Sequence, residues 1–103
     1  MFADLRAVVR YDPGQPVSQL IAENADCRVV LFSLEPGQAV PPHVSTSTVV
    51  MAVLEGNGRL SVGEEDHEAG PGGIAACPPF VPHGMAAAPG SRFVVLAVIA
   101  PRP

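Results

Sequence analysis

The amino-acid sequence predicts an all-β fold, either a sandwich or a barrel, from two observations. Short runs rich in Val, Ile and Leu alternate with turn-forming Gly and Pro residues, and no long segment shows a helical period. In addition, 48% of the 103 residues are hydrophobic and only 16% are charged, which is too apolar for a disordered chain. The 10 Gly and 12 Pro residues therefore belong to turns between short strands.

Eight segments have the apolar, β-branched composition of strands. They are Leu5–Arg10, Val17–Ile21, Cys27–Leu34, Val49–Leu54, Arg59–Val62, Gly73–Cys77, His83–Ala88 and Phe93–Ala100. The sharpest turn signal is Asn57-Gly58, because Asn-Gly is the preferred two-residue hairpin connection. It predicts that Val49–Leu54 pairs antiparallel with Arg59–Val62. The length and the lack of a repeat or linker predict one domain over residues 1–103.

Charge and hydropathy exclude two classes of partner. The chain carries six positive and ten negative side chains, a net charge of -4, which argues against a nucleic-acid partner. The longest apolar run, Phe93–Ala100, has eight residues, well short of the roughly 20 that a membrane helix needs.

The first twelve residues lack the pattern of a secretory signal, so we expect a cytoplasmic protein. In that compartment Cys27 and Cys77 are expected to be reduced thiols.

Two of the expected strands predict a homodimer. Val29–Phe32 and Phe93–Ala100 are apolar at every position, whereas a strand with one exposed face alternates between apolar and polar residues. Both faces of these strands should therefore be buried. A chain of this size has one core to cover one face, and the simplest cover for the other is a second copy of the same protein.

The order and spacing of two motifs resemble those of the cupin family. The segment Gly37–Gly56 is similar to the first cupin motif, G-x5-H-x-H-x3-E-x6-G, with every spacing kept. Gly37, His43 and Gly56 match, while Ser45 stands in place of the second His and Val49 in place of the Glu. Two of the three metal ligands that this motif normally supplies are therefore absent.

The second motif, G-x5-P-x-G-x2-H-x3-N, is similar to Gly72–Ala87. Here Gly72, Pro78 and His83 match, and Phe80 and Ala87 replace the motif's Gly and Asn. The resemblance extends over nearly the whole chain. It implies a jelly-roll β-barrel of two antiparallel sheets, RmlC-like, with a pocket that opens at one end.

The same resemblance implies which residues form the site. In cupins with all four ligands, three His and one Glu hold a divalent metal, whereas this sequence keeps only His43 and His83. Alternation along the strand places Ser45, Ser47 and Met51 on the face that the resemblance turns into the barrel, as ligand-binding residues. We expect no tightly bound metal, since two of the four ligands are missing, but a weakly held divalent ion on the two histidines stays open.

Two functions remain open at this stage. The first is a small-molecule-binding cupin without a tightly held metal. The alternative is a cupin enzyme, of the dioxygenase or isomerase type, that acts on a small polar metabolite through His43 and His83 as catalytic residues. A purely structural role for each histidine is also open, because fold alone does not select a function. His67 lies in a run of carboxylates and is expected to be solvated surface.

Overall fold

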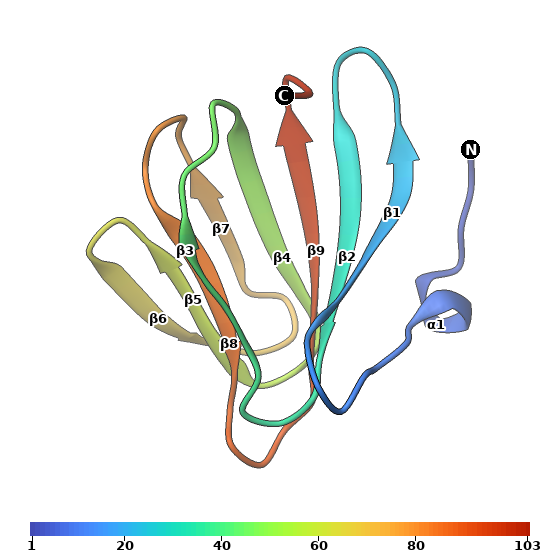
Figure 1. Ribbon diagram of the computed structural model, residues 1–103, viewed down its shortest axis with the longest axis vertical. Coiled ribbons are helices and arrows are strands. Elements are labelled where there is room, and N and C mark those ends of the chain that lie inside the picture. The colour runs from blue at the N-terminus through green and yellow to red at the C-terminus, as the bar shows by residue number, and fades with distance from the viewer.

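The computed structural model describes residues 1–103 and contains nine strands and one short helix (Figure 1). The elements, in chain order, are α1 (Leu5–Val8), β1 (Val17–Glu23), β2 (Arg28–Leu34), β3 (Ala39–His43), β4 (Thr48–Gly56), β5 (Gly58–Val62), β6 (Glu65–Ala69), β7 (Ile74–Cys77), β8 (His83–Ala87) and β9 (Phe93–Ala100). The predicted all-β fold is confirmed.

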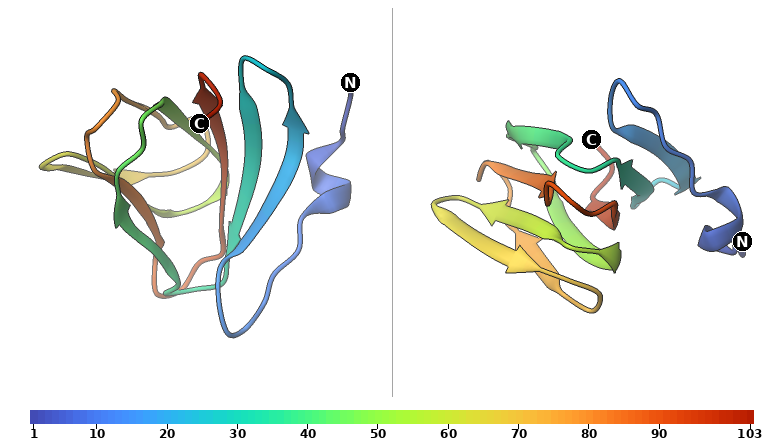
Figure 2. Two further views of the ribbon diagram at one scale, coloured as in Figure 1. Left: turned by 45° about the horizontal axis from the view of Figure 1, so that its top comes forward. Right: turned by 90° about the horizontal axis from the view of Figure 1, so that it is seen from below.

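The strands form two antiparallel sheets that face each other (Figures 1 and 2). The five-stranded sheet has the order β1-β2-β9-β4-β7, and the four-stranded sheet has the order β3-β8-β5-β6. The loops β1–β2, β3–β4 and β7–β8 lie at one end of the molecule, together with the C-terminus (Figure 1). We call this the open end, and the opposite end, where β4 passes into β5, the closed end.

The core lies between the sheets and is built by alternation along each strand. On β4, for example, Val49, Met51 and Val53 are at most 3% exposed, whereas the intervening Val50 and Ala52 are half-buried. The core cluster consists of Leu34, Val49, Met51, Val53, Leu60, Cys77, Met85, Ala87, Phe93, Val95 and Ala97. Aliphatic side chains, the sulfur-containing side chains of Met and Cys and the ring of Phe93 therefore fill the barrel. The buried polar group at the open end, His83, departs from this apolar packing.

The predicted β4–β5 hairpin is wrong. β4 pairs with β7 and β9, and β5 pairs with β6 and β8, so the chain crosses from one sheet to the other at Asn57. The neighbouring glycines allow this crossing to pass close to other backbone. A Cβ on Gly56 would lie 1.7 Å from the Arg92 carbonyl oxygen, and a Cβ on Gly58 would lie 2.3 Å from that of Ala86. The Asn-Gly pair thus serves sheet-to-sheet packing rather than a hairpin turn.

Three other segments differ from the expectation. The first expected strand contains helix α1, whose first turn is capped by the Asp4 carboxylate, which accepts a hydrogen bond from the Arg6 N–H at 3.1 Å. Strands β3 and β6 were not expected, because one contains Pro41-Pro42 and the other is almost entirely polar. Both are edge strands, where proline and charged residues are tolerated. The one helix is neither long nor apolar enough to cross a membrane.

The closed end gives the first testable prediction. Gly56→Ala should destabilise the protein by at least about 3 kcal/mol, because the new methyl group overlaps the Arg92 carbonyl and the φ of +79° disfavours a side chain. The matched control is Gly37→Ala, which has a φ of +78° but nothing within 4 Å of the new Cβ. It should cost only about 1 kcal/mol. Urea unfolding of both variants measures the difference, and equal losses would contradict the packing role of Gly56.

Candidate functional site

The open end of the barrel brings the two predicted histidines together. His43 is the last residue of β3 and His83 the first of β8, and the two are direct cross-strand partners. Directly opposed side chains on one face of an antiparallel pair lie about 5 Å apart at Cβ. Their ring centroids are 4.3 Å apart with an interplanar angle of 55°. The predicted meeting of the two imidazoles at the pocket is confirmed.

Backbone carbonyls orient both rings. Nδ1 of His43 lies 3.3 Å from the Pro41 carbonyl oxygen, and Nδ1 of His83 lies 3.3 Å from that of Val81. A carbonyl oxygen can only accept a hydrogen bond, so each contact requires the proton on Nδ1. In the neutral rings Nε2 is then the free acceptor atom. No hydrogen bond within the protein occupies either Nε2 atom.

The two histidines differ in their exposure to solvent. His83 is only 4% exposed, whereas His43 is exposed. Burial is the main cause that lowers the pKa of His83 below its ordinary value of 6.5; the nearby His43 adds to this, and the Val81 carbonyl opposes it. His83 is therefore neutral at pH 7, and its Nε2 is a hydrogen-bond acceptor and a potential base.

A small cavity of about 30 Å³ lies beneath the histidine pair. It is lined by Phe32, His43, Val49, Met51, His83, Gly84, Met85, Ala97 and Ile99. This volume holds about two water molecules, whereas pockets for drug-sized ligands measure roughly 300–1,000 Å³. The cavity thus has room for one polar group of a ligand, and the rest of such a ligand would lie in the mouth.

Of the three predicted ligand-binding residues, the structure places only Met51 at this cavity. The Ser45 hydroxyl accepts a hydrogen bond from the Ser47 N–H at 3.0 Å, and the Ser47 hydroxyl donates to the Pro101 carbonyl oxygen. Both hydroxyls thus hold the turn that leads into β4 and the chain end beside it. The expected hydroxyl lining of the mouth is not observed in this arrangement.

The donor atoms do not fit a four-ligand metal site. Val49 lines the cavity and supplies no donor, and no three residues of the types His, Cys, Asp and Glu lie close enough to hold an ion together. Cys77 is the cross-strand partner of Val49, but its Sγ donates to the Val81 carbonyl oxygen at 3.1 Å. Burial raises the pKa of this thiol, which disfavours the thiolate that a metal requires.

Several site residues were not identified from the sequence. Phe32, Met85 and Ile99 line the cavity from β2, β8 and β9, and alternation from the neighbouring core positions could have located them. Phe80 has a φ of +68°, and its N–H donates to the Ser45 carbonyl oxygen at 2.8 Å. This bond ties the β7–β8 loop to the β3–β4 loop at the open end. In these loops Phe80 is 71% exposed and Val44 is 55% exposed.

The other predicted features also have clear positions. His67 lies on β6 with its side chain 64% exposed, beside Glu65, so its assignment as solvated surface is confirmed. Cys27 and Cys77 are both free thiols, as expected.

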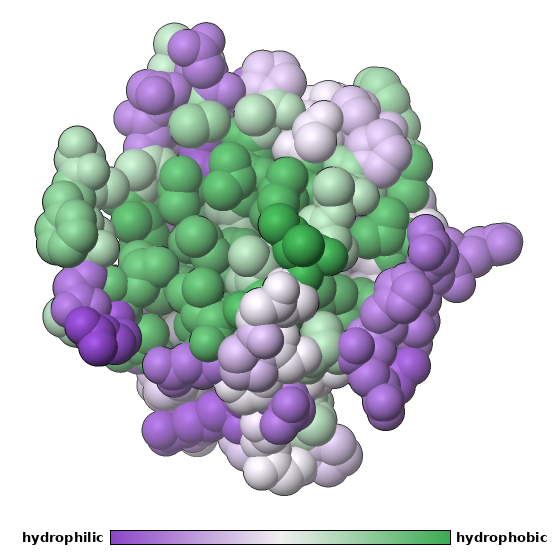
Figure 3. Space-filling model, turned by 180° about the vertical axis from the view of Figure 1, so that it is seen from behind, coloured by the Kyte–Doolittle hydropathy of each residue, from purple (hydrophilic) through white to green (hydrophobic).

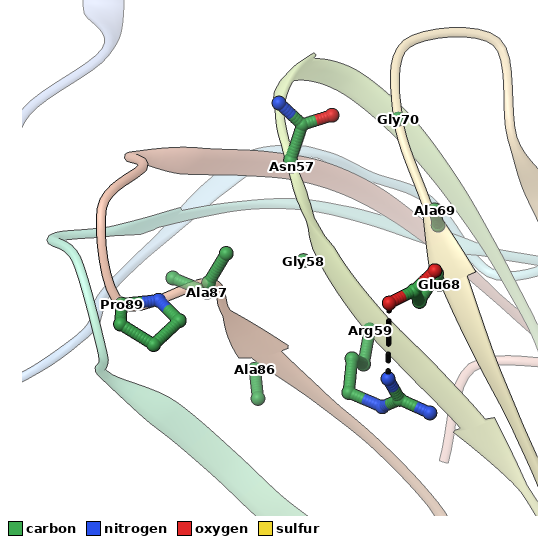
Figure 4. Close-up of a pocket in the computed structure, with 10 residues that line it drawn as sticks. Asn57, Gly58, Arg59, Glu68, Ala69, Gly70, Ala86, Ala87 and Pro89 are labelled. Carbon is green, nitrogen blue, oxygen red and sulfur yellow. Dashed lines mark ion pairs between the residues drawn. The ribbon is translucent and has the colours of Figure 1, made fainter.

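A larger hollow of about 530 Å³ lies along β5, β6 and β8 of the four-stranded sheet (Figure 4). Gly58, Ala86 and Ala87 are among the small residues that line it. The Arg59 guanidinium on its wall is 3.6 Å from the Glu68 carboxylate and also pairs with Asp66. Because these charged groups are exposed and already paired, the histidine cavity is the better candidate site.

Comparison with known proteins agrees with this architecture. The sequence model of the cupin domain matches residues 30–99, so the chain belongs to the cupin family. Protein TT1209 from Thermus thermophilus is 35% identical with a TM-score of 0.94, and the match covers 99% of this chain and 98% of that one. An RmlC-like cupin from Desulfovibrio desulfuricans is 31% identical with a TM-score of 0.81, covering 90% and 89%.

The same fold occurs in proteins of lower identity. The polyketide cyclase RemF from Streptomyces resistomycificus is 24% identical with a TM-score of 0.75, and the match covers 92% of this chain and 72% of that one. At this identity the likeness concerns the fold alone. A comparison with curated proteins gave no match.

The burial of His83 predicts a pH-dependent stability. Because its pKa is lowered in the folded state, the unfolded chain binds the proton more readily, and the free energy of unfolding should fall as the pH drops below about 6.5. His83→Asn should reduce this loss between pH 7.5 and pH 5, measured by urea unfolding at each pH. The matched control is His67→Asn on exposed β6, which leaves His83 in place and should keep the wild-type loss. An unchanged slope in His83→Asn would contradict the assignment.

The missing ligands give a gain-of-function prediction. Ser45→His combined with Val49→Glu should raise the affinity for Mn²⁺ or Ni²⁺ by about a hundredfold or more, because it restores the imidazole and the carboxylate that the family's motif carries at these two positions. Isothermal titration measures the affinity, and circular dichroism checks that the barrel still folds with a carboxylate at the buried position 49. The control pair combines Ser45→His with Val49→Gln, because the Gln side chain has nearly the shape of Glu but lacks its negative charge. Equal affinities in a folded double variant and the wild type would mean that position 49 does not face the ion.

Proposed function

We propose that this cupin binds a small molecule whose oxygen-bearing polar group, a hydroxyl or a carboxyl, contacts the edges of the His43 and His83 rings at the open end. The observation that carries the proposal is the pair of imidazoles 4.3 Å apart, each held by a backbone carbonyl at Nδ1 and free at Nε2. A histidine pair with no ligand to bind would have no need of two adjacent imidazoles at a cavity.

The chemistry of the surroundings supports a ligand with an apolar body. The cavity walls are almost entirely apolar, with Phe32, Val49 and Met51 among them. Val44 and Phe80 expose apolar surface in the two loops at the open end. A small ligand that buries a polar group at the imidazoles and covers these side chains would gain both hydrogen bonds and apolar contact, the usual combination in small-molecule sites.

A second candidate function, a cupin enzyme acting through the same two histidines, is favoured by their unequal burial. His83 has a lowered pKa and is neutral at pH 7, so it can accept a proton, and the His43 side chain beside it is exposed to solvent. A weakly held divalent ion on the two imidazoles belongs to this second candidate. Proton NMR spectra recorded over time distinguish an enzyme from a binding protein, because only an enzyme would convert the bound compound.

The proposal is tested by a thermal-shift screen with small carboxylic acids, phenols and alcohols. His43→Ala should abolish the melting-temperature shift of any compound that stabilises the wild type, because it removes one of the two acceptors. Since His43 is exposed, this variant should lose less than about 1 kcal/mol of stability. The control His67→Ala should keep the full shift. A compound that stabilises the wild type and His43→Ala equally would show that binding occurs elsewhere.

The pH dependence of affinity identifies the polar group. A carboxylate must meet a protonated imidazole, so its affinity should rise as the pH falls from 7.5 to 5.5. A hydroxyl donates its one hydrogen bond to the neutral His83 imidazole, so its affinity should fall over the same range. If His83→Asn costs about 3 kcal/mol or more of stability and leaves affinity unchanged, His83 is a structural residue.

A further inference from the structure

Phe80 adopts a left-handed backbone conformation, with a φ of +68°. Glycine occupies the other positions with positive φ, which are Gly37, Gly56, Gly63 and Gly72. A side chain strains the backbone in this region, because its Cβ lies too close to the neighbouring carbonyl oxygen. The family's second motif has Gly where this chain has Phe80. The chain therefore accepts strain that a glycine would avoid.

The Phe80 ring does little for the fold. Its neighbour Val81 packs against the core cluster, whereas Phe80 is 71% exposed. Exposed hydrophobic side chains are common on this protein, as Figure 3 shows for the face seen from behind, so exposure alone indicates no function. A residue that is both strained and exposed is different, because neither backbone preference nor core packing accounts for it. Strained residues of this kind cluster at functional sites.

The loop that carries this ring is constrained. Between β7 and β8 the chain contains Pro78, Pro79 and Pro82, and each proline fixes its own φ. The Phe80 N–H donates to the Ser45 carbonyl oxygen at 2.8 Å, which ties this loop to the β3–β4 loop. A side chain on a loop held in this way loses little conformational freedom when a ligand covers it. The ring is therefore suited to be part of a binding surface.

The same hydrogen bond places Phe80 near the histidine site. Ser45 follows His43 by two residues, so their Cα atoms are at most about 7.6 Å apart. Phe80 itself precedes His83 by three residues. The cavity under the histidines holds only about 30 Å³, so the body of a ligand bound there must lie outside it, among the loops of the open end (Figure 1). Phe80 lies within reach of that body.

We infer that Phe80 is a specificity-determining residue of this site, and that the ligand body it contacts is a planar aromatic ring bearing a hydroxyl or carboxyl group. The inference rests on the proposed function and names the class of compound. Aromatic rings attract one another in offset-stacked or edge-to-face geometry, beyond the effect of the area they bury. A saturated ring of the same size lacks this attraction. Val44, 55% exposed in the β3–β4 loop, adds apolar contact.

Matched pairs of probes test the inference on the full chain. Benzoate is paired with cyclohexanecarboxylate, and phenol with cyclohexanol, so each pair shares its polar group and differs in the aromatic character of the ring. The wild type should bind the aromatic member of at least one pair about fivefold to tenfold more tightly, measured by NMR titration. Apolar burial alone would not favour the aromatic member, because the saturated ring has at least as much apolar surface.

Phe80→Leu keeps an apolar side chain but removes the aromatic face. It should reduce the preference for the aromatic probe to about twofold or less, whereas Phe80→Tyr should keep it. The matched control is Phe2→Leu, which changes a 90% exposed phenylalanine before α1 and should keep the full preference. Phe80→Gly should also lose the preference, yet its melting temperature should not fall by more than about 5 °C, because glycine adopts the left-handed conformation without strain.

These measurements separate the inference from the proposed function. Probes that bind His43→Ala as tightly as the wild type would show that they bind elsewhere, and both would then be wrong. If binding requires His43 but the aromatic and saturated members bind equally, or the preference survives Phe80→Leu, the inference alone is overturned. Absence of binding by all four probes would overturn it as well. So would a larger fall in the melting temperature of Phe80→Gly, since the ring would then support the fold.

Discussion

The arrangement of the two sheets depends on one close backbone approach at the closed end. There the chain leaves β4 and enters β5, and Gly56 passes so near the Arg92 carbonyl that no side chain fits. Gly58 makes a similar approach to Ala86 and to the Phe93 ring. Since these contacts join the start of β9 to the crossing between sheets, they set how the sheets face each other.

The candidate site places a buried polar side chain, His83, in a barrel whose core is otherwise filled by apolar residues. His83 is buried at the cost of a lowered pKa, and the adjacent His43 remains open to water. Their Nδ1 atoms are held by carbonyls of the same strands and loops that bring them together. In a chain that has lost the charged ligand of its family, the neutral His83 imidazole and the apolar walls favour recognition of one polar group on a small molecule.

In strands β4 and β9, side chains alternate between the two faces of the five-stranded sheet, and both faces are apolar. Their inner residues, such as Met51 and Ile99, line the cavity, and their outer residues, such as Val50 and Val98, lie on the opposite face of the five-stranded sheet. A strand that is apolar on both sides needs cover on both sides. Inside, the four-stranded sheet provides this cover, and outside the sequence predicts a second copy of the chain.

The sequence by itself determined the fold class, most of the strands, the exposed position of His67 and the meeting of His43 with His83. These features depend on local composition, on alternation and on motif spacing, all of which can be read along the chain. Only the tertiary structure decided that β4 and β5 belong to different sheets, that Ser45 and Ser47 use their hydroxyls on the backbone, and that the cavity is small. These outcomes depend on contacts between residues far apart in the chain, such as Gly56 with Arg92 and Ser47 with Pro101, and local preferences do not specify which distant backbone a turn or a hydroxyl will meet.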